Sequence, residues 1–472
     1  MNGIEVSAII TIIVIIGIFA GLYKIIQSFM RNENKVFDFE RDHKEATTKP
    51  PYKGTKQLDN NAKQSSKCTN QNEEAVFIGT STNNKNVFIP SNAKHVFVCG
   101  TTGSGKTVAL SNFIKAGADF DYPMLIVDGK GDTDTGSLLD IVEKLCPKRK
   151  IYAINFNEPD KSDKYNPFKN TSTDVIKDML INMTNWSEEH YKYNTERYIL
   201  RLLKLIEKEG ISLSLESLVK YLPTDNFNKL SKDLSVKKLI TKEERIEDSE
   251  LAKISGKIAE SAGARFATIK ESSLGQIFDG SGIDIYTALE ENAIILFILN
   301  PLLYPEMSPL IGNLIVIDSK KAVSKFFHHK KKRIFYILDE INVYASSSLL
   351  DLVNKSRSAN IACILATQSL SDLDSVSAEF KEQIIENCNN YIALRQNSSI
   401  NAEHWASIFG TRPTMQATYQ IKEGESTQLG SLRKTREFIY HPDDIKLLKA
   451  GMAVFLSRDR MEHTKISIQK PF

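Results

Sequence analysis

Residues 100–107 read Gly-Thr-Thr-Gly-Ser-Gly-Lys-Thr and match the pattern GxxxxGK[ST] at every fixed position. In such a loop the glycines let the backbone bend until its N–H groups converge on a phosphate. The competing interpretation is a glycine-rich turn with an exposed lysine. The setting favours the phosphate site, because His95–Cys99 reads as a strand and Val108–Ile114 can continue as a helix.

These residues predict that ATP and Mg²⁺ are the cofactors. Lys106 would reach the β- and γ-phosphates, and the Thr107 hydroxyl would ligate Mg²⁺. The predicted nucleotide-binding residues are Gly100, Thr101, Thr102, Gly103, Ser104, Gly105, Lys106 and Thr107.

Two carboxylates follow a second apolar run, Ile334–Leu338. Asp339 at the tip of such a strand can hold the hydration shell of Mg²⁺, and the adjacent Glu340 can take a proton from the attacking water. Acids at strand ends are also common as simple solvated ends. Because the same chain carries a phosphate loop, we predict a metal role for Asp339 and general-base catalysis for Glu340.

Three further polar positions have two interpretations each. Gln368 follows the apolar run Ile361–Ala366 and can orient the attacking water, or can be an ordinary polar residue that leaves a buried strand. Arg357 precedes that run and reads either as a catalytic arginine that serves a neighbouring subunit or as a surface arginine. The stretch 128–132, Asp-Gly-Lys-Gly-Asp, can approach the nucleotide or form a tight turn.

The elements that must position these residues alternate between strands and helices, which predicts an α/β fold with a parallel sheet. Short runs rich in Val, Ile and Phe mark the strands. The predicted strands are Ala75–Ile78, Val87–Ile89, His95–Cys99, Met124–Val127, Ala293–Leu299, Ile334–Leu338, Ile361–Ala366 and Tyr391–Leu394, with added edge strands at Phe438–Tyr440 and Met452–Leu456.

The section 170–263 has a different texture, because apolar residues recur there at helical spacing. It predicts an all-helical insertion domain, although peripheral helices of the same core fit the periodicity equally well. The P-loop ATPase domain would then comprise residues 75–169 and 264–472.

The N-terminal residues 1–30 contain an uncharged aliphatic run that begins at Val6 and is long enough for one transmembrane helix. Glu5 precedes the run and no small-residue cleavage pattern follows it, which favours an uncleaved anchor over a signal peptide. Lys24, Arg31 and Lys35 come after most of the run, so we expect a single pass through the inner membrane with the bulk of the chain in the cytoplasm. Residues 31–74, rich in Asn, Lys, Thr and Ser, predict a flexible cytoplasmic tether.

Composition places the 472-residue chain among ordinary globular proteins, with 41% hydrophobic and 25% charged residues. A net charge of +3 does not by itself indicate nucleic-acid binding, so any DNA-contacting surface must be local, for instance in a pore. The five cysteines form no CxxC pair, which speaks against a zinc site or a disulfide framework.

Taken together, these motifs resemble the coupling proteins of conjugation and type IV secretion, of the TraG/TraD kind, within the FtsK/HerA division of P-loop motors. The resemblance covers nearly everything after the tether. It rests on GTTGSGKT with the strands before it, on 126–132, on Tyr165-Asn166-Pro167-Phe168, on Leu338-Asp339-Glu340, on 366–370, and on the closing segments 437–445 and 451–454.

The resemblance implies a RecA-like P-loop core and an ATP-driven homo-hexamer that moves DNA through its central channel. It implies relaxase or relaxosome partners and secretion-channel proteins, with the helical domain at the mouth of the ring. Arg357 precedes Gln368 by the spacing that the family uses for its arginine finger. Two departures stand out: only one membrane span is visible where many members have two, and Gly129 occupies a place often held by proline.

Three rival functions follow from the same residues. One is an ATPase that energises protein export or pilus assembly without touching nucleic acid, and a second is a chromosome translocase of the FtsK/HerA type. The third is a nucleotide-binding scaffold without turnover, against which the intact Lys106 and Glu340 argue.

Overall fold

The computed structural model describes residues 74–91, 94–183, 188–327, 332–422 and 425–472, together with Gly21, Tyr23, Lys24 and Trp186. The expected membrane span and nearly all of the expected tether lie outside these residues. No helix within the described part of the chain is both long enough and apolar enough to cross a membrane. The chain forms two compact units, one with Gly410–Ile439 and one with Ser65–Phe409 and Tyr440–Phe472.

The larger unit is built on an eleven-stranded sheet with the order β2-β1-β13-β12-β9-β3-β8-β7-β4-β6-β5. The seven strands from β9 to β5 are parallel, and the four from β12 to β2 continue the sheet in antiparallel fashion. Their bounds are β1 Ala75–Ser81, β2 Asn86–Pro90, β3 Val96–Cys99, β4 Met124–Asp128, β5 Ile151–Asn155, β6 Ile294–Ile298, β7 Ile334–Leu338, β8 Ile361–Thr367, β9 Asn390–Ala393, β12 Met452–Ser457 and β13 Glu462–Ile468.

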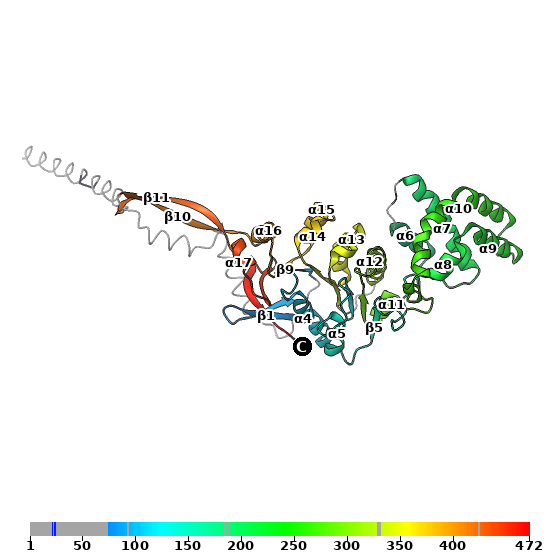
Figure 1. Ribbon diagram of the computed structural model, residues 1–472, viewed down its shortest axis with the longest axis horizontal. Helices are drawn as coiled ribbons and strands as arrows, with labels where there is room; N and C mark the ends of the chain where they lie inside the picture. Colours follow the sequence, from blue (N-terminus) through cyan, green and yellow to red (C-terminus); the bar gives the residue numbers. More distant parts are fainter. Residues whose placement is uncertain are drawn as a thin grey trace, which may run out of the picture. The chain divides into compact units, whose positions relative to one another are not determined.

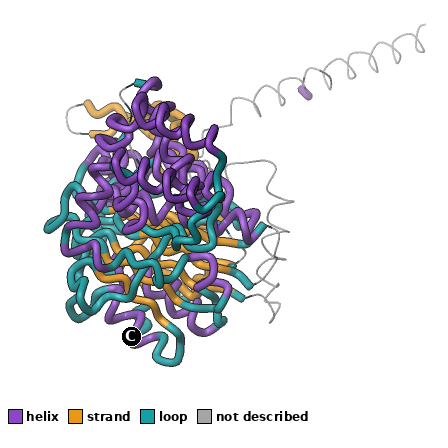
Figure 2. Tube along the Cα trace, turned by 90° about the vertical axis from the view of Figure 1, so that its right-hand side faces the viewer, coloured by secondary structure: helices purple, strands orange, loops and turns teal. Residues whose placement is uncertain are grey.

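The central parallel strands are buried along their whole length, which explains why they read as continuous apolar runs. Figure 2 shows strands (orange) with helices (purple) and loops (teal) around them. The helices of the core are α4 Lys106–Asp119, α5 Leu138–Leu145, α11 Ile285–Glu290, α12 Met307–Phe326, α13 Ser347–Ser356, α14 Leu370–Asp374, α15 Ala378–Asn387, α16 Ser399–Phe409 and α17 Pro442–Lys446, with 3₁₀ turns η1 Ser273–Gln276, η2 Ile341–Tyr344 and η3 Arg357–Ala359.

A bundle of five helices occupies the section that was expected to be helical (Figure 1). Helix α10 continues past Gly263, the predicted end of the insertion, to Glu271 because Phe266 and Ile269 extend its buried face. The five helices are α6 Thr173–Asn182, α7 Glu189–Lys208, α8 Leu215–Tyr221, α9 Thr224–Val236 and α10 Lys242–Glu271.

The smaller unit contains a long hairpin of two strands, β10 Thr411–Lys422 and β11 Glu425–Phe438. The expected edge strand at 438–440 is wrong beyond Phe438, because Ile439 and Tyr440 are not in a strand. The chain turns there since His441 caps α17 and Pro442 occupies its first position, where a proline is well tolerated.

Candidate nucleotide site

The phosphate loop joins the end of β3 to the start of α4, the strand-to-helix setting that its sequence predicted. Gly103 and Gly105 have φ values of 73° and 107°, in the region that side chains disfavour. At Gly100 a Cβ atom would lie 2.6 Å from both Leu394 Cβ and Ser104 Oγ. The glycines are therefore required for the bend and for close packing.

Three backbone hydrogen bonds anchor this loop to neighbouring segments of the domain. The Gly100 N–H donates to the Thr367 carbonyl over 3.3 Å, and the Thr101 N–H donates to the Arg395 carbonyl over 3.1 Å. The Ser104 carbonyl accepts from Gly451 over 2.9 Å. Strand β8, the chain after β9 and the closing segment thus fix the loop from three directions.

The residues of the loop fit a bound phosphate chain. The Ser104 side chain is fully buried, and its Oγ has no hydrogen-bond partner among the residues that the structure describes. Leaving such a hydroxyl unpaired costs about 1–3 kcal/mol. A phosphate oxygen at the N-terminus of the 14-residue helix α4 would accept from this hydroxyl and from the loop N–H groups, and would be favoured by the helix dipole.

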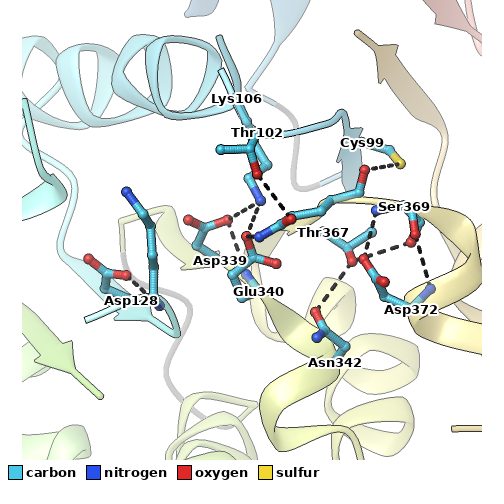
Figure 3. A network of polar contacts seen from close by, with 12 residues as sticks. Cys99, Thr102, Lys106, Asp128, Asp339, Glu340, Asn342, Thr367, Ser369 and Asp372 are labelled. Carbon is cyan, nitrogen blue, oxygen red and sulfur yellow. Dashed lines mark hydrogen bonds and ion pairs between the residues drawn. The ribbon is translucent and has the colours of Figure 1, made fainter. Parts of the chain in front are cut away.

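The acidic pair lies directly beside the loop lysine (Figure 3). Lys106 Nζ forms an ion pair with Glu340 Oε1 and lies 3.5 Å from Asp339 Oδ1. Glu340 has a left-handed backbone, with a φ of 48°, which costs a non-glycine residue about 1–3 kcal/mol. The Tyr344 hydroxyl donates to the Asp339 carbonyl over 2.9 Å and helps to hold this strained turn.

Burial and charge shift the pKa values at this site. Burial raises the pKa of Glu340, and the nearby Asp339 charge adds to this, whereas Lys106 opposes it. Burial alone would lower the pKa of Lys106, but the two carboxylates outweigh it and the pKa is raised. Glu340 is therefore a stronger base than a solvated carboxylate, as a general base requires, while Lys106 stays charged.

Gln368 connects the loop with the catalytic acid. Its Nε2 donates to Glu340 Oε1 over 3.0 Å, and its Oε1 accepts from the Thr102 hydroxyl over 3.2 Å. Thr367 leads into this position from β8, and its hydroxyl interacts with Asn342 Oδ1 over 3.4 Å. The amide thus lies where it can contact both the phosphates and a water near Glu340.

Asp128 ends β4, the strand next to β7, and forms the tight turn that is one of the two interpretations of its motif. Its carboxylate accepts from the backbone of Lys130 over 2.8 Å and of Gly131 over 3.3 Å, which makes a tight turn. A Cβ atom on Gly129 would lie 2.9 Å from the Asp339 carbonyl, so the turn packs against the acidic pair. Burial and the Asp339 charge raise the pKa of Asp128 to about 7.

Arg357 is the one predicted catalytic residue that the structure does not bring to this site. It is exposed and precedes β8, whereas Gln368 follows that strand. Seven residues of strand at about 3.3 Å each separate the two positions by roughly 20 Å. Arg357 therefore does not reach the nucleotide held by its own Lys106. An exposed position at this end of β8 is compatible with both interpretations, a surface arginine and an arginine that serves a neighbouring subunit.

Comparisons with known proteins agree with these motifs. Residues 333–450, which include the acidic pair and Gln368, match the family model described as the TraM recognition site of TraD and TraG. Residues 59–122, which include the phosphate loop, match the FtsK/SpoIIIE family. The chain is a TraG/TraD-type, FtsK-like coupling protein.

Solved structures share the fold of this coupling protein. TrwBΔN70, a bacterial conjugative coupling protein solved in an unbound form, has a TM-score of 0.61 and 17% identity, covering 85% of this chain and 90% of that one. TrwB in complex with ADP and Mg²⁺ has a TM-score of 0.59 and 18% identity, covering 82% and 88%. At this identity the likeness establishes the RecA-like P-loop α/β fold. An uncharacterised protein of Mycoplasma pneumoniae is 30% identical over 101 residues, which are 21% of this chain and 67% of that protein.

Sequence reasoning missed the partners that brace the coupling protein's site. Arg395, Tyr344 and Asn342 contact its loops only through backbone groups or single hydrogen bonds, and no local motif marks them. Gly451 was noted as part of a closing segment, but nothing in its neighbours indicated that its N–H reaches Ser104. The feature that distinguishes Gly451 is its positive φ, and only the structure reveals that angle.

Proposed function

We propose that this coupling protein is a membrane-anchored ATPase that uses ATP hydrolysis to translocate DNA, bringing a relaxase–DNA complex to a conjugation or type IV secretion channel. The observation that carries the proposal is the convergence of Lys106, Glu340 and Gln368 at the carboxyl edge of one parallel sheet. The choice of DNA as the transported substrate is based on the family relationship, because the related motors pump DNA.

The chain's own residues divide the chemistry among them. Lys106 and the loop N–H groups bind and orient the β- and γ-phosphates, and their fixed positive charge favours the transition state of phosphoryl transfer. Bound Mg²⁺ neutralises phosphate charge, and the residues that would hold it are Thr107, on the first turn of α4, and Asp339. This set suits Mg²⁺, which is usually held by one or two protein groups together with substrate phosphates.

Glu340 and Gln368 act on the water. Glu340 takes a proton from the attacking water, and the Gln368 amide fixes that water relative to the carboxylate. Thr102 orients the amide, because its hydroxyl donates to the amide oxygen and leaves the NH₂ group facing Glu340.

The proposed active form is a ring of six identical subunits under the inner membrane. Two considerations support a ring: Arg357 is exposed and distant from its own site, and an arginine finger in this chemistry can be supplied by a neighbour. The aliphatic run within residues 1–30 would provide the single-pass anchor, with the soluble part in the cytoplasm.

Steady-state ATP hydrolysis by the purified full-length chain, with and without single- and double-stranded DNA, tests this proposal. DNA should stimulate turnover, and Glu340→Gln should abolish both the basal and the stimulated rate. Hydrolysis that is indifferent to DNA would instead favour the ATPases that energise protein export or pilus assembly.

A further inference from the structure

A short turn after β6 exposes two leucines at the carboxyl edge of the parallel sheet. Leu302 is 92% exposed and Leu303 is 59% exposed. Single apolar side chains at a surface are ordinary, whereas two adjacent leucines on one turn concentrate apolar surface in one place. This leucine turn comprises residues 300–304.

The leucine turn holds its two leucines in a fixed position. The Asn300 side chain accepts from the Leu303 N–H over 2.9 Å, and the Tyr304 N–H donates to the Asn300 carbonyl over 2.8 Å. Pro301 and Pro305 restrict the backbone before and after the leucines. Side chains on such a rigid turn lose little conformational freedom when they dock on a partner.

The leucine turn is packed against the turn that supports the acidic pair. A Cβ atom on Gly131 would collide with the Leu299 carbonyl oxygen, so residues 128–132 lie directly against the start of the leucine turn. A Cβ atom on Gly129 would lie 2.9 Å from the Asp339 carbonyl oxygen. The leucines are therefore two packed turns away from the catalytic carboxylates.

An apolar pocket of about 440 Å³ lies around the C-terminal half of α4, between that helix, β1 and residues 469–471. The last turn of α4 leads into β4, so the pocket lies toward the amino edge of the parallel strands. A cavity of about 150 Å³ is enough for a benzene ring, so this pocket has room for two leucine side chains. Its apolar lining residues are Ala75, Phe77, Ala116, Phe120 and Pro471.

A series of polar contacts connects the pocket side of the molecule with the turn that carries Arg357. Tyr122 comes just after the α4 segment that lines the pocket, and its hydroxyl lies 3.1 Å from Ser91 Oγ. Arg333 donates to Ser91 Oγ over 2.8 Å and to Asn360 Oδ1 over 3.4 Å. The Asn360 N–H donates to the Arg357 carbonyl over 3.1 Å. The apolar pocket and Arg357 thus lie on the same edge, opposite the nucleotide site and the leucine turn.

This distribution makes the two edges of the chain complementary. In the proposed ring, Arg357 of one subunit faces the nucleotide of the next, so the amino edge of one copy faces the carboxyl edge of its neighbour. The apolar pocket of the first copy then faces the leucine turn of the second. A contact between two different surfaces of one chain repeats head to tail, and such contacts close into rings.

We propose that the leucine turn docks in the apolar pocket of a second copy of this chain. The inference rests on the proposed function, because the ring determines which edges face each other. Leucine side chains have no donor for a phosphate, which disfavours nucleic acid as the partner, whereas the apolar pocket of another copy offers the surface that they need. Docking would also bear on residues 128–132 and thereby link subunit contact to the acidic pair.

Covalent cross-linking of the detergent-solubilised full-length chain tests which surfaces meet. The cysteine pair is Leu302→Cys with Lys470→Cys, an exposed residue at the pocket, in a Cys68→Ser background, because the other four cysteines are buried. A short bismaleimide should give a ladder of covalent multimers that ends at the closed ring, and neither single cysteine should give one. The control pair uses Val236→Cys, which is 76% exposed in the helical bundle, in place of Leu302→Cys and should give no ladder.

Analytical ultracentrifugation over a range of protein concentrations measures what the leucines contribute. Burying one leucine favours association roughly 10- to 100-fold, so Leu302→Ser with Leu303→Ser should raise the concentration for half-maximal assembly at least about tenfold. Val236→Ser with Leu239→Ser removes two exposed apolar side chains from the bundle and should leave that concentration unchanged. Because the leucines lie outside the nucleotide site, both variants should bind ATP as the wild type does.

Any of three results would overturn the inference while leaving the proposed function intact: wild-type assembly by the leucine variant, a ladder that stops at dimers, or cross-links that join the two cysteines within one chain. Equal weakening in the leucine and bundle variants would likewise overturn it, because the effect would then come from apolar surface in general. A wild-type chain that stays monomeric at every concentration would refute the ring, and with it the proposed function.

Discussion

The ion pairs of Lys106 allow a quantitative prediction about the nucleotide site in the absence of nucleotide. The three side chains involved are nearly buried: Lys106 is 11% exposed, Asp339 is 4% exposed and Glu340 is 7% exposed. Removing one partner of a buried ion pair typically costs 3–5 kcal/mol, because the other charge stays buried. Here each carboxylate keeps one donor, the Glu340 N–H for Asp339 and the Gln368 amide for Glu340. We therefore expect Lys106→Ala to destabilise the domain by about 3 kcal/mol, at the lower end of that range.

Glu340→Gln should behave differently because its amide oxygen can still accept from Lys106 while one of two crowded negative charges is removed. Its expected effect on the free energy of unfolding is within about 1 kcal/mol. In this background Lys106→Ala leaves only Asp339 without its cation, so the lysine substitution should cost about 1–2 kcal/mol less than in the wild type.

Urea unfolding at pH 7.5 measures this cycle. Trp405 is fully buried and stacks on Phe97 of β3 with ring centroids 5.9 Å apart, so its fluorescence reports on the strand that carries the loop. Replacing the only other tryptophan, Trp186→Phe, isolates this signal. Lys115→Ala is a matched control, because its ion pair with Asp119 is exposed on the same helix and should contribute less than about 1 kcal/mol.

Nucleotide binding provides the second readout of the same variants. Lys106→Ala should weaken ATP binding at least about tenfold, since a hydrogen bond to a charged group contributes about 1.5–3 kcal/mol. Glu340→Gln should bind ATP as the wild type does but should not hydrolyse it. Additive unfolding energies together with equal loss of ATP affinity in both variants would refute the assigned roles.

Three further predictions concern other parts of the protein. Rings that mix Arg357→Ala subunits with Glu340→Gln subunits should recover some ATP hydrolysis, because a finger contributes roughly three to five decades of rate and some interfaces keep both groups; mixed rings with no recovery would remove the support for an arginine acting on its neighbour. Burial lowers the pKa of His95 to about 4 from 6.5, so the unfolded chain takes up the proton first as the pH falls. Stability measured by urea unfolding should therefore drop by about 3 kcal/mol between pH 6.5 and 4, and His95→Gln should lack this component; an equal drop in the variant would contradict it. Asp318→Asn should cost about 3–5 kcal/mol of unfolding free energy, because Asp318 is fully buried 2.6 Å from Lys321; a loss under about 1 kcal/mol would show that the pair is not held together in solution.

Physical reasons separate what the sequence predicts here from what it does not. Strands β4, β6, β7 and β8 are buried on both faces, so apolarity alone reveals them. Strand β13, which pairs with β12 and β1, was not predicted because its residues are mostly polar and partly exposed. Strand β5 was not predicted either, because it lies at the edge of the sheet and is only half-buried. The hairpin 411–438 was not predicted because it has no apolar run of the length that marked the other strands.

The candidate site shows the same division. The phosphate loop and the acidic pair can be read from the sequence because their chemistry requires particular residues next to each other in the chain. Arg357 and Gln368 are only eleven positions apart, but a strand separates them, so the sequence distance hides that they lie at opposite ends of β8. Gly451 and Arg395 brace the loop through their backbones, and backbone contacts leave almost no trace in residue type.

The most direct test of the central claim measures ATP hydrolysis by the full-length chain across a range of protein concentrations, with and without DNA, while ring formation is followed by analytical ultracentrifugation. If the protein is a DNA-translocating ring, hydrolysis, DNA binding and DNA stimulation should rise together as rings form, because only a ring assembles the neighbour's arginine and a continuous DNA path. Rings that hydrolyse ATP equally fast with and without DNA, and that bind no DNA at low salt, would contradict the account and favour a motor for protein export.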